Sequence, residues 1–226
     1  MREMLSSNSE DYLKAIYLAT QNGKLSTQTL ADTLGITPPS VNGMIKKLTE
    51  LSLVEHVPYG GITLTDAGQK IALEIIRHHR LIELYLHNTL GYPLDAVHEE
   101  AERLEHVISE TFEARIAEAL GHPTHDPHGD PIPTKDGKLP TSATLALAAL
   151  PSGQHARLGR IAQGDHDFMR YLEHLGLIPG AMLRVLSVNI PASTITVEVN
   201  GTEHTMALEV ATRLWVNDVT VGGIPT

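Results

Sequence analysis

The order of sequence patterns over residues 9–65 constrains the fold of this chain more than any other feature. Apolar side chains with helical spacing predict an amphipathic helix over residues 9–21. A second, shorter helix is expected between Ser26, a suitable N-cap, and Gly35, a typical stop. A third helix is expected from Thr37 onward, because proline is well placed in a first helical turn.

A β-rich segment follows these three helices. Residues 54–65 read VEHVPYGGITLT, in which Pro-Tyr-Gly-Gly separates two short β-forming runs. Three helices followed by a two-stranded wing is the order of a winged helix-turn-helix, which places its third helix in the DNA major groove. A winged helix used only for protein contacts is the alternative. We favour DNA binding, because the third helix begins with small and polar side chains that can approach base edges.

We expect eight side chains of this region to face DNA. Those between Thr37 and Asn42 are the expected base contacts, and the two lysines can reach phosphates. The full set is Ser26, Thr27, Thr37, Pro39, Ser40, Asn42, Lys46 and Lys47.

Composition limits the remaining chemistry. The 226 residues include no cysteine, which excludes disulfides, iron–sulfur clusters and thiolate metal sites. No run of about 18 apolar residues indicates a membrane span, and the N-terminus has no apolar signal core, so a cytoplasmic protein is expected. The net charge of −10 argues mildly against nucleic-acid binding. Residues 65–120 hold 11 acidic and 5 basic side chains, and a bound cation would partly neutralise them.

The rest of the chain reads as helices followed by a β-rich domain. Helices are expected over residues 65–90, 93–109 and 110–120. Residues 121–142 are rich in Pro, Gly and Asp, a linker composition, and His122, His125 and His128 are expected to be unligated surface residues. From about residue 151 a short helix, 167–177, precedes alternating strands, with Asn200-Gly201 as a tight hairpin turn.

Two consecutive helices carry potential metal ligands beside their apolar stripes. On a helix of 100° per residue, residues 97–108 place His98, Glu102, Glu105 and His106 in one arc. The adjoining arc holds Leu94, Val97, Ala101, Leu104 and Ile108. On the preceding helix, His79 and Glu83 lie one turn apart at the edge of its stripe. Carboxylates converging where such helices pack are costly unless compensated, and a divalent cation would compensate them. A solvated, salt-bridged face is the alternative.

Catalytic motifs are absent. HEEAE at 98–102 lacks the second histidine of the HExxH zinc-protease motif. ERLEH at 102–106 lacks the first histidine of the inverted motif, HxxEH. A di-iron site would need Glu-x-x-His on two helices, and no phosphate-binding glycine loop is present. The sequence therefore argues against an enzyme, with a zinc hydrolase as the rival class and a metal-independent winged-helix regulator as another.

Five motifs together resemble the diphtheria toxin repressor family of metal-dependent transcriptional repressors, in its manganese-responding type. They are EDYLKAIY at 10–17, TPPSVNGMIKKL at 37–48, RHHRLIELYL at 77–86, VHEEAERLEHVIS at 97–109 and PHGDPIP at 127–133. The resemblance implies an α+β protein with three domains. These are a winged helix-turn-helix over 1–64, a helical metal-binding and dimerisation domain over 65–142 with a linker from about 121, and an SH3-like (FeoA-like) β-barrel domain over 143–226.

The resemblance also implies two metal sites per subunit. Asp11, Glu102, Glu105 and His106 match the primary, regulatory site. His79, Glu83 and His98 match the ancillary site, which longer members complete from the SH3-like domain. Candidates for that completion are Asp165, His166 and Asp167.

The expected cofactor is Mn²⁺, with Fe²⁺ as the alternative. Iron-responding members of the family have Met and Cys at the positions of Asp11 and Glu102, whereas this chain has carboxylates, and hard oxygen donors suit Mn²⁺. Short manganese-responding members have a glutamate where this chain has Lys14. A binuclear cluster is therefore not expected here.

The resemblance implies a switch that acts on a homodimer. Without metal, Asp11, Glu102 and Glu105 repel one another, and Mn²⁺ would join the first helix to the helical domain. A dimer with fixed recognition helices then fits a palindromic operator. The apolar stripe of Leu94, Val97, Ala101, Leu104 and Ile108 is expected to form the dimer surface, with intrachain core as the alternative. The expected targets are genes of metal-ion uptake, and no membrane or small-molecule substrate is implied.

Overall fold

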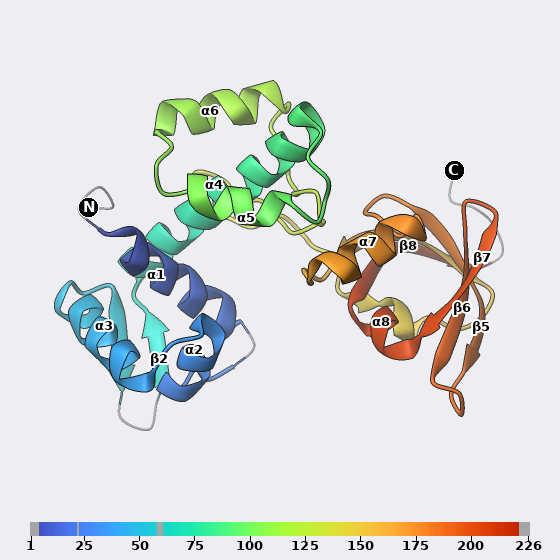
Figure 1. Cartoon of the computed structure of the whole chain (residues 1–226), viewed down its shortest axis with the longest axis horizontal. Coiled ribbons are helices and arrows are strands. Elements are labelled where there is room, and N and C mark those ends of the chain that lie inside the picture. Colours follow the sequence, from blue (N-terminus) through green and yellow to red (C-terminus); the bar gives the residue numbers. More distant parts are fainter. Residues whose placement is uncertain (1–4, 22, 58–60, 222–226) are drawn as a thin grey trace. The chain divides into compact units, whose positions relative to one another are not determined.

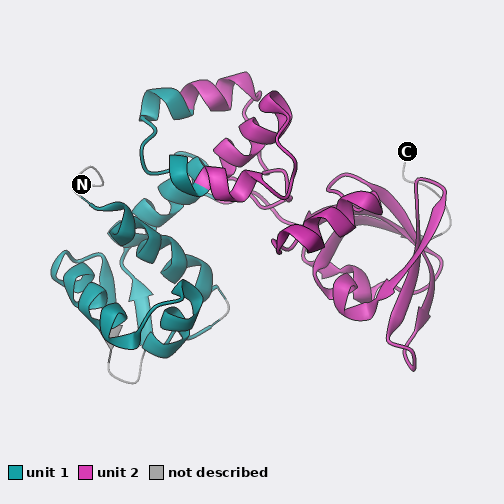
Figure 2. Cartoon of the chain, in the orientation of Figure 1, with its two compact units in different colours: residues 1–79, 102–113, 133–138 teal, residues 80–101, 114–132, 139–226 magenta. Residues whose placement is uncertain are grey.

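The computed structural model describes residues 5–21, 23–57 and 61–221, and it has the expected α+β composition (Figure 1). The chain forms two compact units (Figure 2). Unit 1 comprises residues 1–79, 102–113 and 133–138, and unit 2 comprises 80–101, 114–132 and 139–226. This division cuts across the three expected domains, so the boundaries at 64 and 142 stay predictions.

Unit 1 contains the winged helix. Its elements are α1 (Ser7–Thr20), α2 (Thr27–Leu34), α3 (Pro38–Glu50), β1 (Val54–Val57) and β2 (Gly61–Leu64). The Ser26 hydroxyl accepts a hydrogen bond from the amide of Thr29 at 3.0 Å, and Gly35 ends α2 with a left-handed φ of 65°. Both predicted caps of α2 are therefore confirmed. β1 and β2 pair antiparallel, whereas Asn22 and the wing turn at 58–60 lie outside the described residues.

Helices α1 and α3 pack against each other in the core of the winged helix. Leu13 and Ile16 on α1 are fully buried, as are Val41 and Leu48 on α3. Complete burial of one such side chain contributes about 1.5–3 kcal/mol. The position of α1 therefore fixes the position of α3, the helix predicted to enter the DNA groove.

The long helix α4 (Asp66–Leu90) begins and ends as expected, with Gly91 at a left-handed φ of 71°. Near its start, Gly68 lies against the segment that leads into β1. A Cβ atom at Gly68 would stand 2.0 Å from the carbonyl oxygen of Leu53, closer than atoms can approach. Glycine is therefore required where α4 crosses this backbone.

The following helices are shorter than the sequence suggested. α5 is Val97–Leu104, not 93–109, and α6 is Glu110–Ala119. After Leu104 the chain turns, and the amides of Val107 and Ile108 both donate to the Leu104 carbonyl, at 3.0 and 3.3 Å. Glu105 therefore lies just beyond the end of the helix. Its buried side chain contacts Lys14 and His79, and these contacts favour the turn over a further helical turn.

Part of the expected linker is a compact loop. Asp126 and His128 are buried, which corrects the expectation that His128 lies on the surface. The Asp126 carboxylate accepts hydrogen bonds from the amides of His128 and Asp130, at 2.8 and 2.9 Å. The Ile132 amide donates to the carbonyl of Thr124, which closes the loop. Hydrogen bonds to the Asp126 carboxylate therefore order this loop, although its Pro- and Gly-rich composition predicted an open linker.

Unit 2 contains a six-stranded antiparallel sheet with strand order β3-β8-β4-β5-β6-β7. Asn200 and Gly201, with φ of 52° and 77°, form the predicted tight turn between β6 and β7. The sheet and its short helices are β3 (Leu145–Ala146), the 3-10 helix Leu147–Ala149, β4 (Gln154–Ile161), α7 (His166–His174), β5 (Met182–Asn189), β6 (Thr194–Val199), β7 (Thr202–Ala207), α8 (Leu208–Thr212) and β8 (Leu214–Val221).

The expected dimer stripe is largely internal. Leu94, Val97 and Ala101 are buried within the single chain, and Leu94 belongs to the core of the C-terminal sheet. The expectation that these three residues face a second subunit is therefore wrong, because their own chain covers them.

The helices of the described residues were also compared with the length and hydropathy that a membrane span requires. None of them meets both requirements.

Candidate metal centre

Three predicted ligands of the primary site come together in unit 1. We call Asp11, Glu105 and His106 the primary cluster. Each offers one ligand atom, and these atoms lie within 4.8 Å of one another. His106 Nε2 is 2.8 Å from Asp11 Oδ1 and 3.5 Å from Glu105 Oε1. The cluster joins α1 of the winged helix to the turn that follows α5.

Glu10 orients the imidazole of His106. The Nδ1 of His106 lies 2.6 Å from the carboxylate of the buried Glu10, which leaves Nε2 facing Asp11 and Glu105. Hydrogen bonds to Asp11 and Glu10 raise the pKa of His106 to about 9, although burial opposes them. The imidazole is therefore protonated at neutral pH, and the Nε2 proton stands where a metal ion would bind.

Lys14 places a positive charge beside the primary cluster. Its ammonium group is 2.5 Å from Glu102 Oε1, 2.9 Å from Glu105 Oε1 and 3.3 Å from His79 Nδ1. His79 also contacts the Glu105 carboxylate directly. Glu102 and His79 therefore lie around Lys14, which offsets much of the carboxylate repulsion that the sequence led us to expect.

The donor set of the primary cluster fits a divalent cation. One imidazole nitrogen and two carboxylate oxygens are suitable ligands for Mn²⁺, Fe²⁺ or Zn²⁺. A carboxylate that holds the second nitrogen of a ligating histidine is the usual outer partner at such sites, and Glu10 has this position. Asp11, Glu105 and His106 would hold the ion, with Glu102 close by.

A second group of potential ligands lies in unit 2. We call Glu83, Asp126 and His128 the second cluster. All three side chains are buried, and one ligand atom from each lies within 4.8 Å of the others. Glu83 Oε2 is 3.7 Å from His128 Nδ1. The Oδ2 of Asp126 and the Nδ1 of His128 are buried atoms for which the described residues provide no hydrogen bond.

The electrostatics of the second cluster favour a bound cation. Burial, Glu83 and Asp130 together raise the pKa of Asp126 to about 7. Burial lowers the pKa of His128, but the carboxylates of Glu83, Asp126 and Asp130 together raise it by more, so the net shift is upward. Buried carboxylates that hold protons near neutral pH are sites where a divalent cation can replace those protons.

The three expected ancillary ligands also come together, because His79, Glu83 and His98 each offer one ligand atom within 4.8 Å of the others. His98 Nδ1 is 3.2 Å from Glu83 Oε1, and the side-chain amide of Gln163 reaches both residues, at 3.4 and 3.5 Å. Asp165 instead caps α7 by accepting a hydrogen bond from the Phe168 amide at 2.8 Å.

Neither Asp165 nor Asp167 joins a metal-binding group in the described part of the chain. His166 lies 3.4 Å from Asp95 and 3.5 Å from Glu99. A metal-binding role for Asp165 and Asp167 stays a prediction.

The predicted DNA-facing side chains are accessible. All are exposed except Thr27, which is half-buried, and Thr37 and Ser40 are joined through their hydroxyl groups at 2.9 Å. Thr27 donates to the side-chain oxygen of Asn42 at 3.4 Å, so exposed polar groups of α2 and α3 meet. Lys47 lies 3.4 Å from the hydroxyl of Ser9 on α1.

Sequence reasoning missed four residues in or beside these clusters. Glu10 and Lys14 flank Asp11 on α1, and only the contacts of a folded chain distinguish them from surface charges. Asp126 and His128 had a visible signal, since they lie in or beside the distinctive PHGDPIP segment that had no role in a winged helix.

Comparison with known proteins accounts for almost the whole chain. The N-terminal DNA-binding domain of iron-dependent repressors matches residues 4–62, and the metal-binding and dimerisation domain of the same proteins matches residues 65–134. The FeoA domain matches residues 145–218.

Individual relatives respond to different metals. The iron-dependent repressor IdeR of Mycobacterium tuberculosis is 30% identical and covers 97% of this chain and 100% of its own length. A solved manganese-dependent transcriptional repressor in complex with manganese is 39% identical, with a TM-score of 0.86 over 92% of this chain and 99% of its own. The solved IdeR of T. acidophilum is 32% identical, with a TM-score of 0.72 over 92% of this chain and 96% of its own.

These matches span all three parts of the chain and agree with the winged helix, the ligand clusters and the C-terminal sheet. The chain therefore belongs to the iron-dependent repressor family, which includes the diphtheria toxin repressor and consists of metal-dependent DNA-binding transcriptional repressors, not enzymes.

Proposed function

We propose that this repressor responds to Mn²⁺ through the primary cluster. The observation that carries the proposal is the convergence of Asp11 on α1 with Glu105 and His106 after α5. Asp11, Glu105 and His106 would hold one divalent cation, whose charge replaces the proton of His106 and neutralises the carboxylates. The winged helix would thereby be fixed to the turn at 105–108.

The proposed response depends on the coupling between α1 and α3. Leu13 and Ile16 pack into the same core as Val41 and Leu48, and Ser9 contacts Met44 and Lys47. A cation that holds Asp11 would limit the motion of α1 and therefore of α3. The cation would favour the DNA-binding state to the extent that it binds that state more tightly.

The oxygen donors near the primary cluster favour Mn²⁺ over Fe²⁺ as the bound ion. Asp11 and Glu102 are carboxylates, and the chain has no cysteine that could supply a softer ligand. The relatives include both iron-dependent and manganese-dependent repressors, so their names alone do not decide the metal. Lys14 supports a single ion at this place, because its ammonium group already neutralises Glu102 and Glu105.

The second cluster is proposed as the ancillary metal site. Glu83, Asp126 and His128 are its buried core, and His98 and Gln163 lie at its edge. This set shares Glu83 with the ligand set expected from the sequence, in which His79, Glu83 and His98 also offer ligand atoms within 4.8 Å of one another. His79 is one turn before Glu83 on α4, and a role for it at either site stays a prediction.

DNA recognition is proposed for the exposed surface of α2 and α3. Thr37, Pro39, Ser40 and Asn42 would meet base edges, and Ser26, Thr27, Lys46 and Lys47 would meet the DNA backbone. A two-fold dimer would bind a palindromic operator. A role at metal-uptake genes and a cytoplasmic location are part of the same proposal.

The dimer surface is proposed to include exposed apolar residues of the second family domain. Val107 and Phe112 are 74% and 51% exposed, which is unusual for large apolar side chains. Both lie within residues 65–134, which match the metal-binding and dimerisation domain of the family.

DNA binding to the protein's own promoter region tests the proposal. The protein would be titrated with Mn²⁺, Fe²⁺ and a chelator, as wild type and as the Asp11→Met/Glu102→Cys variant. We expect wild-type binding to require Mn²⁺ and the variant to shift its preference toward Fe²⁺. Glu118→Gln, an exposed carboxylate on α6, is the control. DNA binding that is unchanged by the chelator and by both substitutions would identify a metal-independent regulator.

A further inference from the structure

The first turns of α1 contact both the primary cluster and α3. Glu10 and Asp11 lie beside the two ring nitrogens of His106, at 2.6 and 2.8 Å. The residue before them, Ser9, contacts α3 instead. Successive residues of a helix are rotated by about 100°, so Ser9 and Asp11 face nearly opposite sides of α1. The same part of α1 therefore connects the primary cluster with the helix that is proposed to read DNA.

The hydroxyl group of Ser9 is buried and fully hydrogen-bonded. Its oxygen is 3.4 Å from Lys47 Nζ, 3.7 Å from Met44 Sδ and 3.0 Å from Ser6 Oγ. An ammonium group only donates and a thioether only accepts, so Ser9 accepts from Lys47 and donates to Met44. The second lone pair of Ser9 then accepts from the Ser6 hydroxyl. A hydroxyl group has one donor and two acceptor positions, so these three contacts fix its orientation.

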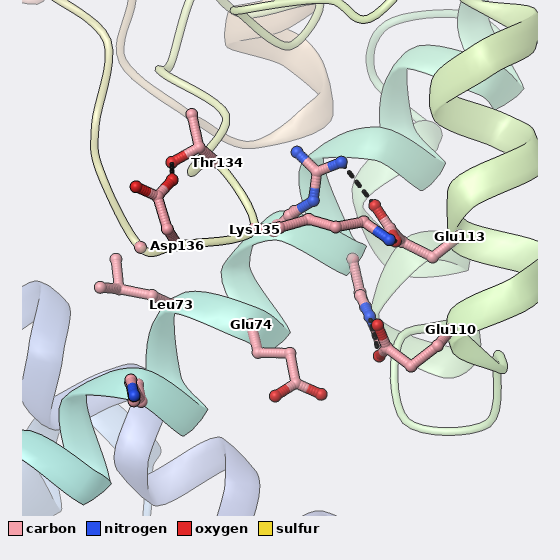
Figure 3. A pocket seen from close by; sticks show the side chains of 11 residues that line it. Leu73, Glu74, Glu110, Glu113, Thr134, Lys135 and Asp136 are labelled. Atoms are coloured by element: carbon pink, nitrogen blue, oxygen red, sulfur yellow. Dashed lines mark hydrogen bonds and ion pairs between the residues drawn. The ribbon is translucent and has the colours of Figure 1, made fainter.

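The charge of Lys47 is not balanced by a carboxylate. Lys14, by comparison, contacts two carboxylates at 2.5 and 2.9 Å. Arg77 and Lys135 lie 2.6 and 3.2 Å from Glu113, beside a pocket of about 310 Å³ (Figure 3). In the part of the chain that the structure describes, Lys47 contacts a neutral hydroxyl group and forms no ion pair. Its full charge therefore remains available to a DNA phosphate.

We propose that Ser9 is a positioning residue, whose hydroxyl group places the ammonium group of Lys47 for contact with a DNA phosphate. This role rests on the proposed function, in which a cation held by Asp11 limits the motion of α1. Such a cation would also fix Ser9, two residues earlier, and with it the direction of the Lys47 side chain. A lysine side chain loses rotational freedom when it binds a phosphate, and placement beforehand reduces that loss.

A double-mutant cycle on DNA binding tests this role. In saturating Mn²⁺, Ser9→Ala should weaken binding to a fragment of the protein's own promoter at least about threefold, as expected for one hydrogen bond. The effect should be smaller in metal-free protein. In the Lys47→Met background, Ser9→Ala should have no further effect, because the side chain that it positions is absent. An equal loss in both backgrounds would overturn the proposal, since Ser9 would then act only through the fold of α1.

Lys46 provides the matched control for this cycle. It precedes Lys47 on α3, is also exposed, and forms no hydrogen bond with Ser9 in the described part of the chain. Ser9→Ala should weaken DNA binding by the same factor in the Lys46→Met background as in the wild type. If Ser9 were coupled equally to both lysines, the specific link to Lys47 would be refuted.

The salt dependence of DNA binding tests the phosphate contact itself. Loss of one phosphate contact reduces the slope of log affinity against log salt concentration by about 0.9. Lys47→Met should show this reduction in saturating Mn²⁺. An unchanged slope would show that Lys47 meets no phosphate, and the positioning role would fail with it.

The Mn²⁺ affinity without DNA separates this role from the proposed function. The hydrogen bonds of the Ser9 hydroxyl involve no ligand of the primary cluster, so Ser9→Ala should bind Mn²⁺ within about twofold of the wild type. A larger fall would show that the substitution disturbs α1 itself, against the proposal. Wild-type DNA binding that does not respond to Mn²⁺ would contradict the proposed function and this role together. A wild-type response that Ser9→Ala leaves unchanged would overturn the positioning role alone.

Discussion

At the scale of single residues, Lys14 determines how the acidic groups near the primary cluster are balanced. Its ammonium group contacts Glu102 and the fully buried Glu105 from a position that is itself only 13% exposed. A buried carboxylate without a partner is strongly unfavourable. Lys14 therefore allows the metal-free protein to keep Glu105 in place, and it occupies the space that a second ion would need.

Replacing Lys14 should destabilise the metal-free protein more than the metal-bound protein. Lys14→Met removes the ammonium group from the buried Glu105 carboxylate, which keeps only its histidine contacts, and this costs about 3 kcal/mol in the free energy of unfolding. Saturating Mn²⁺ should recover much of this loss, because the freed carboxylates can then ligate metal. Urea unfolding with and without Mn²⁺ measures both values, and Lys24→Met is the exposed control. An equal loss in both conditions would contradict this role.

His106 should titrate far above the usual range for histidine in the metal-free protein. Its pKa is about 9 in the folded state, raised by hydrogen bonds to Asp11 and Glu10, against about 6.5 when unfolded. The raised pKa means that its contribution to stability is full below about pH 6.5 and is lost as the pH rises through 9.

Glu10→Gln should lower the pKa of His106, because a neutral amide replaces one carboxylate. An NMR titration of the imidazole in metal-free protein measures this change. Glu118→Gln should leave the titration unchanged. A His106 pKa near 6.5 in the wild type would show that the contacts with Asp11 and Glu10 do not form.

At the scale of helices and strands, local sequence signals explain most of the fold. Ser26 and Gly35 bound α2, and Asn200-Gly201 makes the β6–β7 turn, because caps and turns depend on a few adjacent residues. The end of α5 at Leu104 was not predictable, since Glu105 leaves the helix for partners as distant in sequence as Lys14.

The close contact between α4 and the segment before β1 gives a stability prediction. Gly68→Ala would place a Cβ atom 2.0 Å from the Leu53 carbonyl oxygen, and the forced shift should cost about 1–3 kcal/mol. Gly43→Ala on α3 is the control, because a Cβ there meets no atom within 4 Å. That control should gain up to about 1 kcal/mol from helix propensity. Thermal unfolding of both variants measures the difference, and equal melting temperatures would contradict the packing argument.

At the scale of the whole molecule, the ligand clusters were only partly predictable. Asp11, Glu105 and His106 come together as the motifs implied, because each lies in a segment with a clear pattern. Asp126 and His128 were missed as potential ligands because a Pro- and Gly-rich composition suggested an open linker. Their burial depends on the loop closed between Thr124 and Ile132, and on partners distant in sequence such as Glu83.

The proposed dimer surface gives a prediction for the assembly. Phe112→Asp should weaken self-association at least tenfold, since a charge would replace a large exposed apolar side chain in the contact. Ile190→Asp is the control, because Ile190 is 67% exposed but lies outside the dimerisation domain matched by the family. Sedimentation equilibrium measures both dissociation constants. Equal effects of the two substitutions would rule out this surface.

The central claim is that metal at the primary cluster and DNA at α3 favour the same state of the chain. Linkage then requires each ligand to strengthen the other by the same factor. The most direct measurement is the affinity of the protein for Mn²⁺ with and without a saturating promoter fragment, in wild type and in Asp11→Asn. We predict that DNA raises the wild-type Mn²⁺ affinity by the factor with which Mn²⁺ raises DNA affinity, and that Asp11→Asn abolishes this effect. An Mn²⁺ affinity that is the same with and without DNA would contradict the account.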